Sequence, residues 1–339
     1  MVRRLAIVLI FVVLGATGTA SGASKPPMAF ASEQIATVVG AGLMAPSVAA
    51  FRPKDPLTET EFAVVLASLG VPVAVSDPDR PVTVRELDAR LVSHLGLRPA
   101  AMQIRLAGLN AGLAPKPWLG TETIARMLGL RVNHERGSEA LELQLSQPAT
   151  RAEAAYSLAR VLVLTDEDVE SVRETAATFA VPHLTDLQRS VISRALGFVG
   201  SPYVWAGTSE HAQKLAGTVQ PGGFDCSGFV WRVYKLEPYA SAPGLAKVLR
   251  GRTSYAMSGE VGRSARIARK ALQPGDVVFF GDRGVRSKPA EVGHMGIYVG
   301  NDWIVHSSRF GTTLAPLEDW YETRFAWGRR PLAEAGLEY

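Results

Sequence analysis

The sequence predicts an α+β fold in which an all-α repeat domain precedes a domain where a helix bearing the single cysteine packs on an antiparallel sheet. Three similar segments in the first half each begin an amphipathic helix, whereas apolar residues alternate in the second half as they do in strands. The length of 339 residues suits about two domains. The composition, 47% apolar and 20% charged, is typical of globular protein and argues against extensive disorder.

Residues 1–23 have the pattern of a signal peptide. Arg3 and Arg4 give a basic start, an apolar run extends to Leu14, and small residues continue to Ala23. The apolar run is short for a membrane span, although an uncleaved anchor is the alternative. No later stretch is long and apolar enough to cross a membrane. We therefore expect a secreted protein with no stable membrane span.

The formal net charge is +4, and removal of Arg3 and Arg4 with the signal would take two positive charges away. So small an excess gives no reason to expect a nucleic-acid partner. The basic residues from Lys247 to Lys270 are spread among glycine, serine and alanine. We interpret them as a solvated face, and contact with acidic polymers outside the cell is the alternative. No phosphate-binding glycine loop or dinucleotide fingerprint occurs, so no cofactor is expected.

Three segments of the first half share the pattern Pro-x-Thr-x-x-Glu. In this pattern the threonine caps a helix by accepting a hydrogen bond from the backbone N–H three residues on, and the glutamate side chain reaches back to the N–H of the threonine. Three such capping boxes with the same proline indicate an internal repeat, so residues 31–165 are predicted to form a helical repeat domain. The segments begin at Pro56, Pro81 and Pro148.

A polar, acidic helical stretch follows the repeats, and we interpret residues 166–182 as a linker. Pro182 interrupts the helical pattern. Thr185 and Gln188 then form a further capping box that begins a new helix. The second domain is accordingly expected over residues 183–334.

Cys226 is the only cysteine of the chain. A single cysteine in an exported protein cannot form an internal disulfide and is a candidate reactive thiol, although a buried, inert cysteine is the alternative. Gly222 and Gly223 lead to it, and a helix is predicted to start at it. A helix N-terminus presents unpaired N–H groups and partial positive charge, which stabilise a thiolate and lower the thiol pKa.

His294 and His306 are predicted to lie on neighbouring strands of a β-hairpin, because apolar residues alternate on both sides of a turn at residues 300–302. If the loop has three residues, Val299 pairs with Trp303 and both histidines lie on one face. A two-residue turn would place them on opposite faces. We favour the three-residue loop because it also collects the apolar residues on the other face. Two histidines with a purely structural role are the alternative.

These residue types support nucleophilic catalysis. His294 would take the proton of Cys226 to form a thiolate–imidazolium pair, and His306 would orient the imidazole through its other ring nitrogen. The backbone N–H of Cys226, at a helix start, is a candidate oxyanion donor. One cysteine and two histidines do not give the four-ligand spacing of a zinc site, so no metal is expected. The other four histidines are interpreted as surface or structural residues.

Five motifs occur in a fixed order in the second half of the chain. They are Ser201-Pro202-Tyr203-Val204-Trp205, Phe224-Asp225-Cys226-Ser227-Gly228, the run from Leu272 to Phe280, the run from His294 to Gly300, and His306. Together they resemble the NlpC-type family of papain-like cell-wall peptidases over about residues 190–332.

The resemblance implies a papain-like catalytic domain with a triad of Cys226, His294 and His306. It also implies that Tyr203 lies near the oxyanion, with Asp225 and Ser227 as further candidates for oxyanion or substrate contacts. The implied activity is that of a cysteine endopeptidase of the cell wall, which hydrolyses the bond from γ-D-glutamate to a diamino acid in peptidoglycan stem peptides. An amidase or acyltransferase with the same triad, or a non-catalytic wall-binding protein, is the alternative.

Two motifs of the first half, Phe51-Arg52-Pro53 and Thr150-Arg151-Ala152-Glu153, resemble S-layer homology repeats. Such repeats are helical units that hold proteins on cell-wall polymers, so the resemblance implies a polymer as a partner of this half. The arginine of the second motif occurs only at Arg151, because Glu59 and Val84 replace it in the other copies. A helical packing domain without a ligand is the alternative.

Two segments are longer than is usual in the peptidase family, Ser209 to Gly222 and Arg283 to Glu291. Both are expected to flank the substrate site. The first is expected to be a mobile loop with a short helical part that forms one wall of the site. A solvent-exposed insertion without a role is the alternative, since surface loops tolerate added length.

Overall fold

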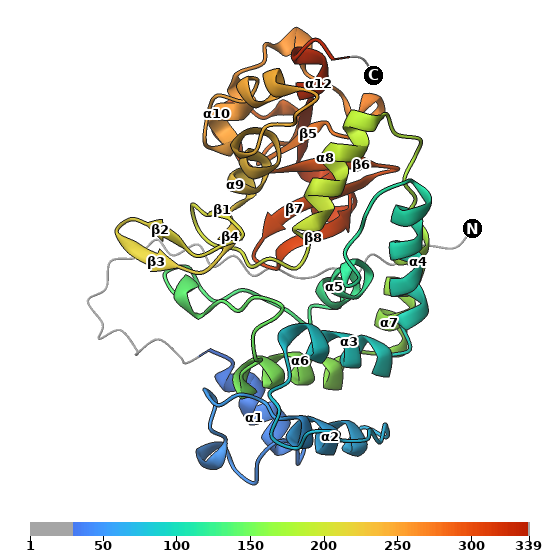
Figure 1. Cartoon of the computed structure of the whole chain (residues 1–339), viewed down its shortest axis with the longest axis vertical. Helices are drawn as coiled ribbons and strands as arrows, with labels where there is room; N and C mark the ends of the chain where they lie inside the picture. Colours follow the sequence, from blue (N-terminus) through green and yellow to red (C-terminus); the bar gives the residue numbers. More distant parts are fainter. Residues whose placement is uncertain (1–29, 338–339) are drawn as a thin grey trace.

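A computed structural model describes residues 30–337 (Figure 1). The first half is helical, and the second half combines helices with a central sheet, as the sequence predicts. The expected signal peptide lies outside the described residues. Within the described part of the chain, no helix has the length and apolar character needed to cross a membrane.

The three Pro-x-Thr segments meet in the middle of the first half. Each forms one antiparallel β-bridge with each of the other two, so that the three segments close into a ring. The repeat predicted from the capping pattern is therefore an approximately threefold arrangement in space. The bridges join Pro56 to Thr150, Thr58 to Pro81 and Thr83 to Pro148. The helices that begin at these segments are α2 (Glu59–Ser68), α3 (Val84–His94) and α6 (Arg151–Val163).

Two of the three predicted capping boxes are complete, and the third is not. At α2 and α3 the threonine and the glutamate exchange both hydrogen bonds. At α6 the Thr150 hydroxyl accepts from the N–H of Glu153, but the glutamate does not return the bond. The Glu153 carboxylate instead lies 2.8 Å from the guanidinium of Arg131. The buried ion pair with Arg131 thus replaces the bond that Glu153 was expected to return to Thr150.

Four other helices complete the first half and its junction with the second. They are α1 (Ser32–Gly40), α4 (Arg98–Asn110), α5 (Leu119–Met127) and α7 (Asp166–Ala177). Most of the segment interpreted as a linker is α7, which packs against α4 and α5 and buries Val172 and Ala176. Just after it, the Phe179 ring lies edge-on to the ring of Trp303, 5.1 Å between centroids. The stretch between the halves is therefore packed rather than free.

Arg151 ties the repeats together from the inside. Only 2% of its side chain is exposed, and it bonds with the Glu61 carboxylate and donates to the backbone oxygens of Phe51 and Met44. Arg151 is the arginine of the motif that resembles S-layer homology repeats. Its N–H groups therefore bond within the fold. Arg52 reaches the same Glu61 from the surface, with 60% of its side chain exposed.

The second half is built on an antiparallel five-stranded sheet with the order β8-β7-β6-β5-β9. Helix α9 packs against β6 and β7, and its Phe229 and Val230 join the main apolar core. The strands are β5 (Val277–Gly281), β6 (Val292–Gly300), β7 (Trp303–Ser308), β8 (Gly311–Pro316) and β9 (Phe325–Arg329). The helices are α8 (Asp186–Gly197), α9 (Cys226–Trp231), α10 (Ser254–Gly259), α11 (Asp319–Arg324) and α12 (Pro331–Glu334).

The β6–β7 hairpin has the predicted register along its length but not the predicted turn. Gly300, not Val299, pairs with Trp303, so the turn has two residues, Asn301 and Asp302, both with positive φ (48° and 59°). A β-bulge before Gly300 inserts one unpaired residue in β6. The bulge restores the alternation that a two-residue turn alone would invert, so the histidines still share a face.

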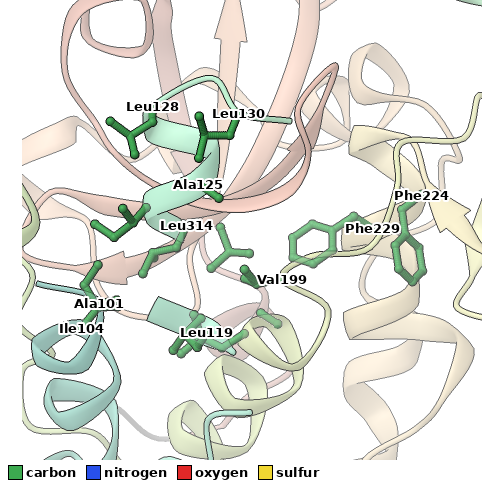
Figure 2. Close-up of a cluster of buried hydrophobic side chains, with 14 of the residues drawn as sticks. Ala101, Ile104, Leu119, Ala125, Leu128, Leu130, Val199, Phe224, Phe229 and Leu314 are labelled. Atoms are coloured by element: carbon green, nitrogen blue, oxygen red, sulfur yellow. The ribbon is translucent and has the colours of Figure 1, made fainter. Parts of the chain in front are cut away.

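The apolar core runs without interruption from one half into the other. Figure 2 shows side chains of α4 and α5 together with Val199 and Leu314. Phe224, just before α9, and Phe229, within α9, belong to the same cluster. All of these residues belong to one buried cluster. The two halves are therefore packed as one body around a shared interior.

We expect Arg151→Met to lower the free energy of unfolding by about 3 kcal/mol, because it removes the buried donor to the Phe51 and Met44 carbonyl groups and the buried cation beside Glu61. The matched variant Arg52→Met removes an exposed ion pair to the same Glu61 and should cost less than about 1 kcal/mol. Urea unfolding followed by far-ultraviolet circular dichroism measures both. Equal losses would contradict the internal role given to Arg151.

Candidate active site

Cys226 is the first residue of α9, where the sequence places it. The short strand β4 (Gly223–Phe224) pairs with β1 (Thr208–Ser209) and leads directly into the helix. Asp225 caps the helix, since its Oδ1 accepts from the backbone N–H of Gly228 and from the Ser227 hydroxyl. These bonds hold the backbone on both sides of the thiol.

The surroundings of the Cys226 sulfur raise its pKa to about 12. Burial is the largest cause, and the negative charge of Asp225 adds to it. The backbone N–H groups of Met295 and Ser227 hydrogen-bond the sulfur and lower the pKa by less. The sequence predicts the opposite direction from the helix start alone, and that prediction is wrong here because burial outweighs the N–H groups. The bond from Met295 places the sulfur against β6, one residue from His294.

His294 on β6 and His306 on β7 contact each other directly. The Nε2 atom of His294 lies 3.1 Å from Nδ1 of His306. This contact leaves Nδ1 of His294 as the nitrogen that can accept a proton, provided that Nε2 carries the hydrogen shared with His306. Burial lowers the pKa of His294 to about 4, and burial together with His294 lowers the pKa of His306 well below its usual value. Both imidazoles are therefore neutral near pH 7.

Three aromatic side chains cover the histidine pair. The ring of Phe280 on β5 lies 5.6 Å from the ring of His294, and the Tyr321 ring of α11 lies 4.9 Å from that of His306. Trp320 lies 6.0 Å from His294 and is 43% exposed, so it borders solvent. This aromatic cover contributes to the burial that lowers the histidine pKa values. No local motif predicts it, because α11 follows His306 without a distinctive pattern.

Gly296 lies directly opposite His306 in the sheet. A Cβ at this glycine would come within 3.0 Å of the His306 Cβ and 2.9 Å of the Val305 oxygen. The sequence suggests that the glycine leaves room for a helix or a substrate. In the structure it leaves room for His306 itself, whereas α9 joins the core on the other, apolar face with Met295 and Ile297.

The three other predicted site residues lie close to Cys226. The pKa of Tyr203 is raised by burial and then by the charges of Cys226 and Asp225, so its hydroxyl stays protonated and can donate. Asp225 and Ser227 both contact the guanidinium of Arg252, at 3.2 and 2.8 Å. Arg252 lies within the basic run that the sequence assigns to a solvated face. That interpretation is wrong for Arg252, because its guanidinium binds Asp225 and Ser227. These residues lie 27 and 25 positions away, so no local pattern predicts the contacts.

The segment that leads into Cys226 is hydrogen-bonded to the segments that carry the other candidate residues. The Phe224 oxygen accepts from the Ser307 hydroxyl at 2.7 Å and from the Val204 N–H at 3.2 Å. Ser307 follows His306, and Val204 follows Tyr203. A single carbonyl two residues before Cys226 thus sets the spacing of three segments of the site.

The inserted segment from Ser209 to Gly222 is a β-hairpin, not the loop with a helical part that the sequence predicts. Its strands are β2 (Gln213–Leu215) and β3 (Thr218–Gln220). The Gln213 side chain bonds four backbone groups at the base, and Glu210 forms two hydrogen bonds with Arg232. Figure 1 shows the hairpin projecting from the body. The other long segment, 283–291, forms two short 3₁₀ turns before β6.

Among residues 30–337, no group of three or more histidine, cysteine or carboxylate side chains is arranged to hold a metal ion. The site's polar groups are instead a thiol, two imidazoles, a phenol and the cluster of Asp225, Ser227 and Arg252. Such a set can supply a nucleophile, a base and hydrogen-bond donors to a developing negative charge.

Residues 200–330 match the model of the NlpC/P60 family, which identifies this part of the chain as an NlpC/P60 domain. Similar curated proteins are the murein DD-endopeptidase MepH of Escherichia coli, 30% identical over 48% of this chain and 54% of that protein, and the probable peptidoglycan endopeptidase LytE of Bacillus subtilis, 35% identical over 39% and 30%. A third is the gamma-D-glutamyl-L-lysine dipeptidyl-peptidase of Bacillus cereus, 34% identical over 33% and 26%. The chain spans about half or less of the length of each.

Similar solved structures include two that are described as NlpC/P60 proteins. An NlpC/P60 family protein from Bacillus cereus is 26% identical, with 46% of this chain and 43% of that chain covered and a TM-score of 0.33. RipD from Mycobacterium tuberculosis, described as a non-catalytic NlpC/p60 domain protein, is 21% identical, with 43% and 98% covered and a TM-score of 0.32.

We expect the alkylation rate of Cys226 to rise steadily between pH 6 and about pH 9, by about tenfold per unit, because only the thiolate reacts and the pKa is raised to about 12. Iodoacetamide labelling measured by intact mass reports on Cys226 alone, since it is the only cysteine. A rate that is already level below pH 7 would contradict the neutral resting pair and restore the ion pair predicted from the sequence.

Proposed function

We propose that this chain is a cysteine endopeptidase that hydrolyses peptide bonds in bacterial peptidoglycan, with Cys226 as nucleophile, His294 as base and His306 as orienter. The observation that carries the proposal is the hydrogen-bonded histidine pair of an NlpC/P60 domain, beside the only thiol of the chain. The names of the related proteins, a murein endopeptidase and peptidoglycan endopeptidases, support peptidoglycan as the substrate.

The preferred bond in this proposal joins γ-D-glutamate to a diamino acid. The similarity to a gamma-D-glutamyl-L-lysine dipeptidyl-peptidase supports it. A stem peptide of this kind carries free carboxylates and an amine. Arg252 and Asp225 form an ion pair beside Cys226, so charges of both signs lie next to the thiol, which suits such a charged peptide.

The reaction begins from a neutral thiol and a neutral imidazole. As the Cys226 sulfur bonds the carbonyl carbon, its proton passes to Nδ1 of His294, and the carbonyl π electrons move to the oxygen. The N–H of Cys226 and the hydroxyl of Tyr203 donate to this oxyanion. The oxyanion collapses, the C–N bond breaks, and the leaving amine takes the proton from His294. Water then attacks the thioester with His294 as base, which frees the carboxylate and restores the thiol.

His306 acts through His294 in this scheme. Its Nδ1 accepts the hydrogen on Nε2 of His294, which fixes the tautomer that leaves Nδ1 available to the thiol. The imidazolium that forms during the reaction is then stabilised by a neutral partner rather than by a carboxylate. The proposal also places the protein outside the cell, in or near the wall, because its substrate lies there.

The proposed function predicts that the full chain converts stem peptides into two products at the γ-D-glutamyl bond, as read by mass spectrometry. Cys226→Ala should abolish the reaction, and His294→Ala should lower kcat/KM by about 10³-fold through loss of the base. His306→Asn should keep part of the activity, about one to ten per cent, because it orients and does not transfer the proton. His183→Ala is the matched control, since that side chain is exposed and lies between α7 and α8, outside the site.

Each outcome separates the alternatives. Cleavage at a different bond would indicate an amidase, and conjugates to an added amine would indicate an acyltransferase. Retained binding to purified peptidoglycan without any product, in the wild-type chain and in Cys226→Ala alike, would contradict the enzyme and support a non-catalytic wall-binding protein.

A further inference from the structure

We propose that Asn133, in the first half of the chain, is a positioning residue that fixes the backbone of Tyr203 beside Cys226. The inference rests on the proposed function, in which Tyr203 donates to the oxyanion, and it deepens that function. It makes the first half a structural part of the active site, in addition to any role in holding the protein on the wall.

Asn133 reaches the site with both its side chain and its backbone. Its Nδ2 donates to the backbone oxygen of Tyr203 at 3.1 Å, and its backbone N–H donates to the oxygen of Arg309 at 2.8 Å. Arg309 lies three residues after His306. One residue of the first half thus joins the segment that carries the phenol to the end of the strand that carries the orienting histidine.

The bond to Tyr203 lies on the side of its segment that the nucleophile loop does not reach. The segment pairs in parallel with Phe224, whose N–H donates to the Pro202 oxygen and whose oxygen accepts from the Val204 N–H. In an extended chain, the N–H and C=O of successive residues point to opposite sides, so those of Tyr203 point away from Phe224. Asn133 therefore supplies the hydrogen bond on the second side.

Together these bonds join four segments into a closed ring, and one of these segments leads into Cys226. The Phe224 oxygen binds the N–H of Val204 on one side and the hydroxyl of Ser307 on the other. Asn133 then joins Tyr203 to Arg309, two residues beyond Ser307. Three segments of the ring come from the NlpC/P60 domain, and the fourth comes from the helical half.

Buried contacts on both sides of Asn133 give it a fixed position. Arg131 is 7% exposed, and its guanidinium lies 2.8 Å from the carboxylate of Glu153 at the start of α6. The backbone N–H of His134 donates to the buried Glu142 carboxylate at 2.6 Å. Glu153 does not complete its capping box, and through Arg131 it instead anchors the segment that carries Asn133.

The same segment touches the edge of the site at two further points. The Arg136 guanidinium lies over the ring of Trp205, 3.8 Å from its centre. The Gln144 side chain donates to the backbone oxygen of Gly222, at the base of the β2–β3 hairpin, at 2.6 Å. Residues 131–145 therefore contact the edge of the site at several points, from Tyr203 to the base of the β2–β3 hairpin.

The test compares Asn133→Ala with Arg189→Met in the full chain. Arg189 on α8 offers a matched control, because its guanidinium also donates to a backbone oxygen of the other half, that of Ala111 at 3.0 Å, while its other bonds go to Leu184 and Asp186 outside the site. Asn133→Ala should lower kcat on stem peptides by about tenfold with KM changed by less than about twofold, the loss expected for one hydrogen bond that acts in the transition state. Arg189→Met should change neither.

Two further measurements separate positioning from general stability. In a Tyr203→Phe background, which lacks the hydroxyl, Asn133→Ala should lower kcat by less than about twofold, because the two residues act through one group. Without any substrate, Asn133→Ala should raise the alkylation rate of Cys226 by more than about twofold, since the loosened Tyr203 segment uncovers the thiol. Arg189→Met should leave the labelling rate unchanged.

The labelling arm stands apart from the proposed function, because it needs no turnover. If the wild-type chain cleaves no stem peptide, the proposed function fails, and altered labelling in Asn133→Ala alone would still support the positioning of Tyr203. Unchanged labelling in Asn133→Ala, equal effects in Arg189→Met, or losses that add fully to those of Tyr203→Phe would each overturn the inference.

Discussion

The pairing of β6 with β7 is the constraint from which the geometry of the site follows. It brings His294 and His306 to 3.1 Å, and it does so only because the bulge before Gly300 offsets the two-residue turn at Asn301 and Asp302. A slip of one residue would move one histidine to the apolar face, where α9 packs. The same register places the backbone of Met295 against the sulfur of Cys226, so one strand pairing brings the two imidazoles and the thiol together.

Burial sets the chemistry that this geometry allows. Phe280, Trp320 and Tyr321 shield the histidines and keep both imidazoles neutral, while burial and the neighbouring Asp225 keep the Cys226 proton on sulfur. A charged thiolate–imidazolium pair is therefore not the resting state. In the proposed mechanism the proton moves only as the sulfur bonds the substrate, when the developing oxyanion offsets the cost of separating charge.

Local pattern predicted local structure well, and contacts distant in sequence account for what it missed. The helix start at Cys226, the shared histidine face and two complete capping boxes follow from spacing within about ten residues. Glu153 departed from its predicted cap because Arg131 offered a stronger partner, and the direction of the Cys226 pKa departed because burial is a tertiary property. Asn133 reaches Tyr203 across 70 residues, a contact that no local motif reports.

In the proposed mechanism, Cys226 attacks the peptide carbonyl and carries the acyl group. Peptide mapping by mass spectrometry, on full chain quenched with acid during turnover of a stem peptide, detects that group. We expect an adduct with the mass of the acyl fragment on the peptide that contains Cys226. In the His294→Ala variant, acylated with an activated ester, the adduct should accumulate further because the base for its hydrolysis is missing. Product formation without any adduct on Cys226, or an adduct on another residue, would contradict this mechanism.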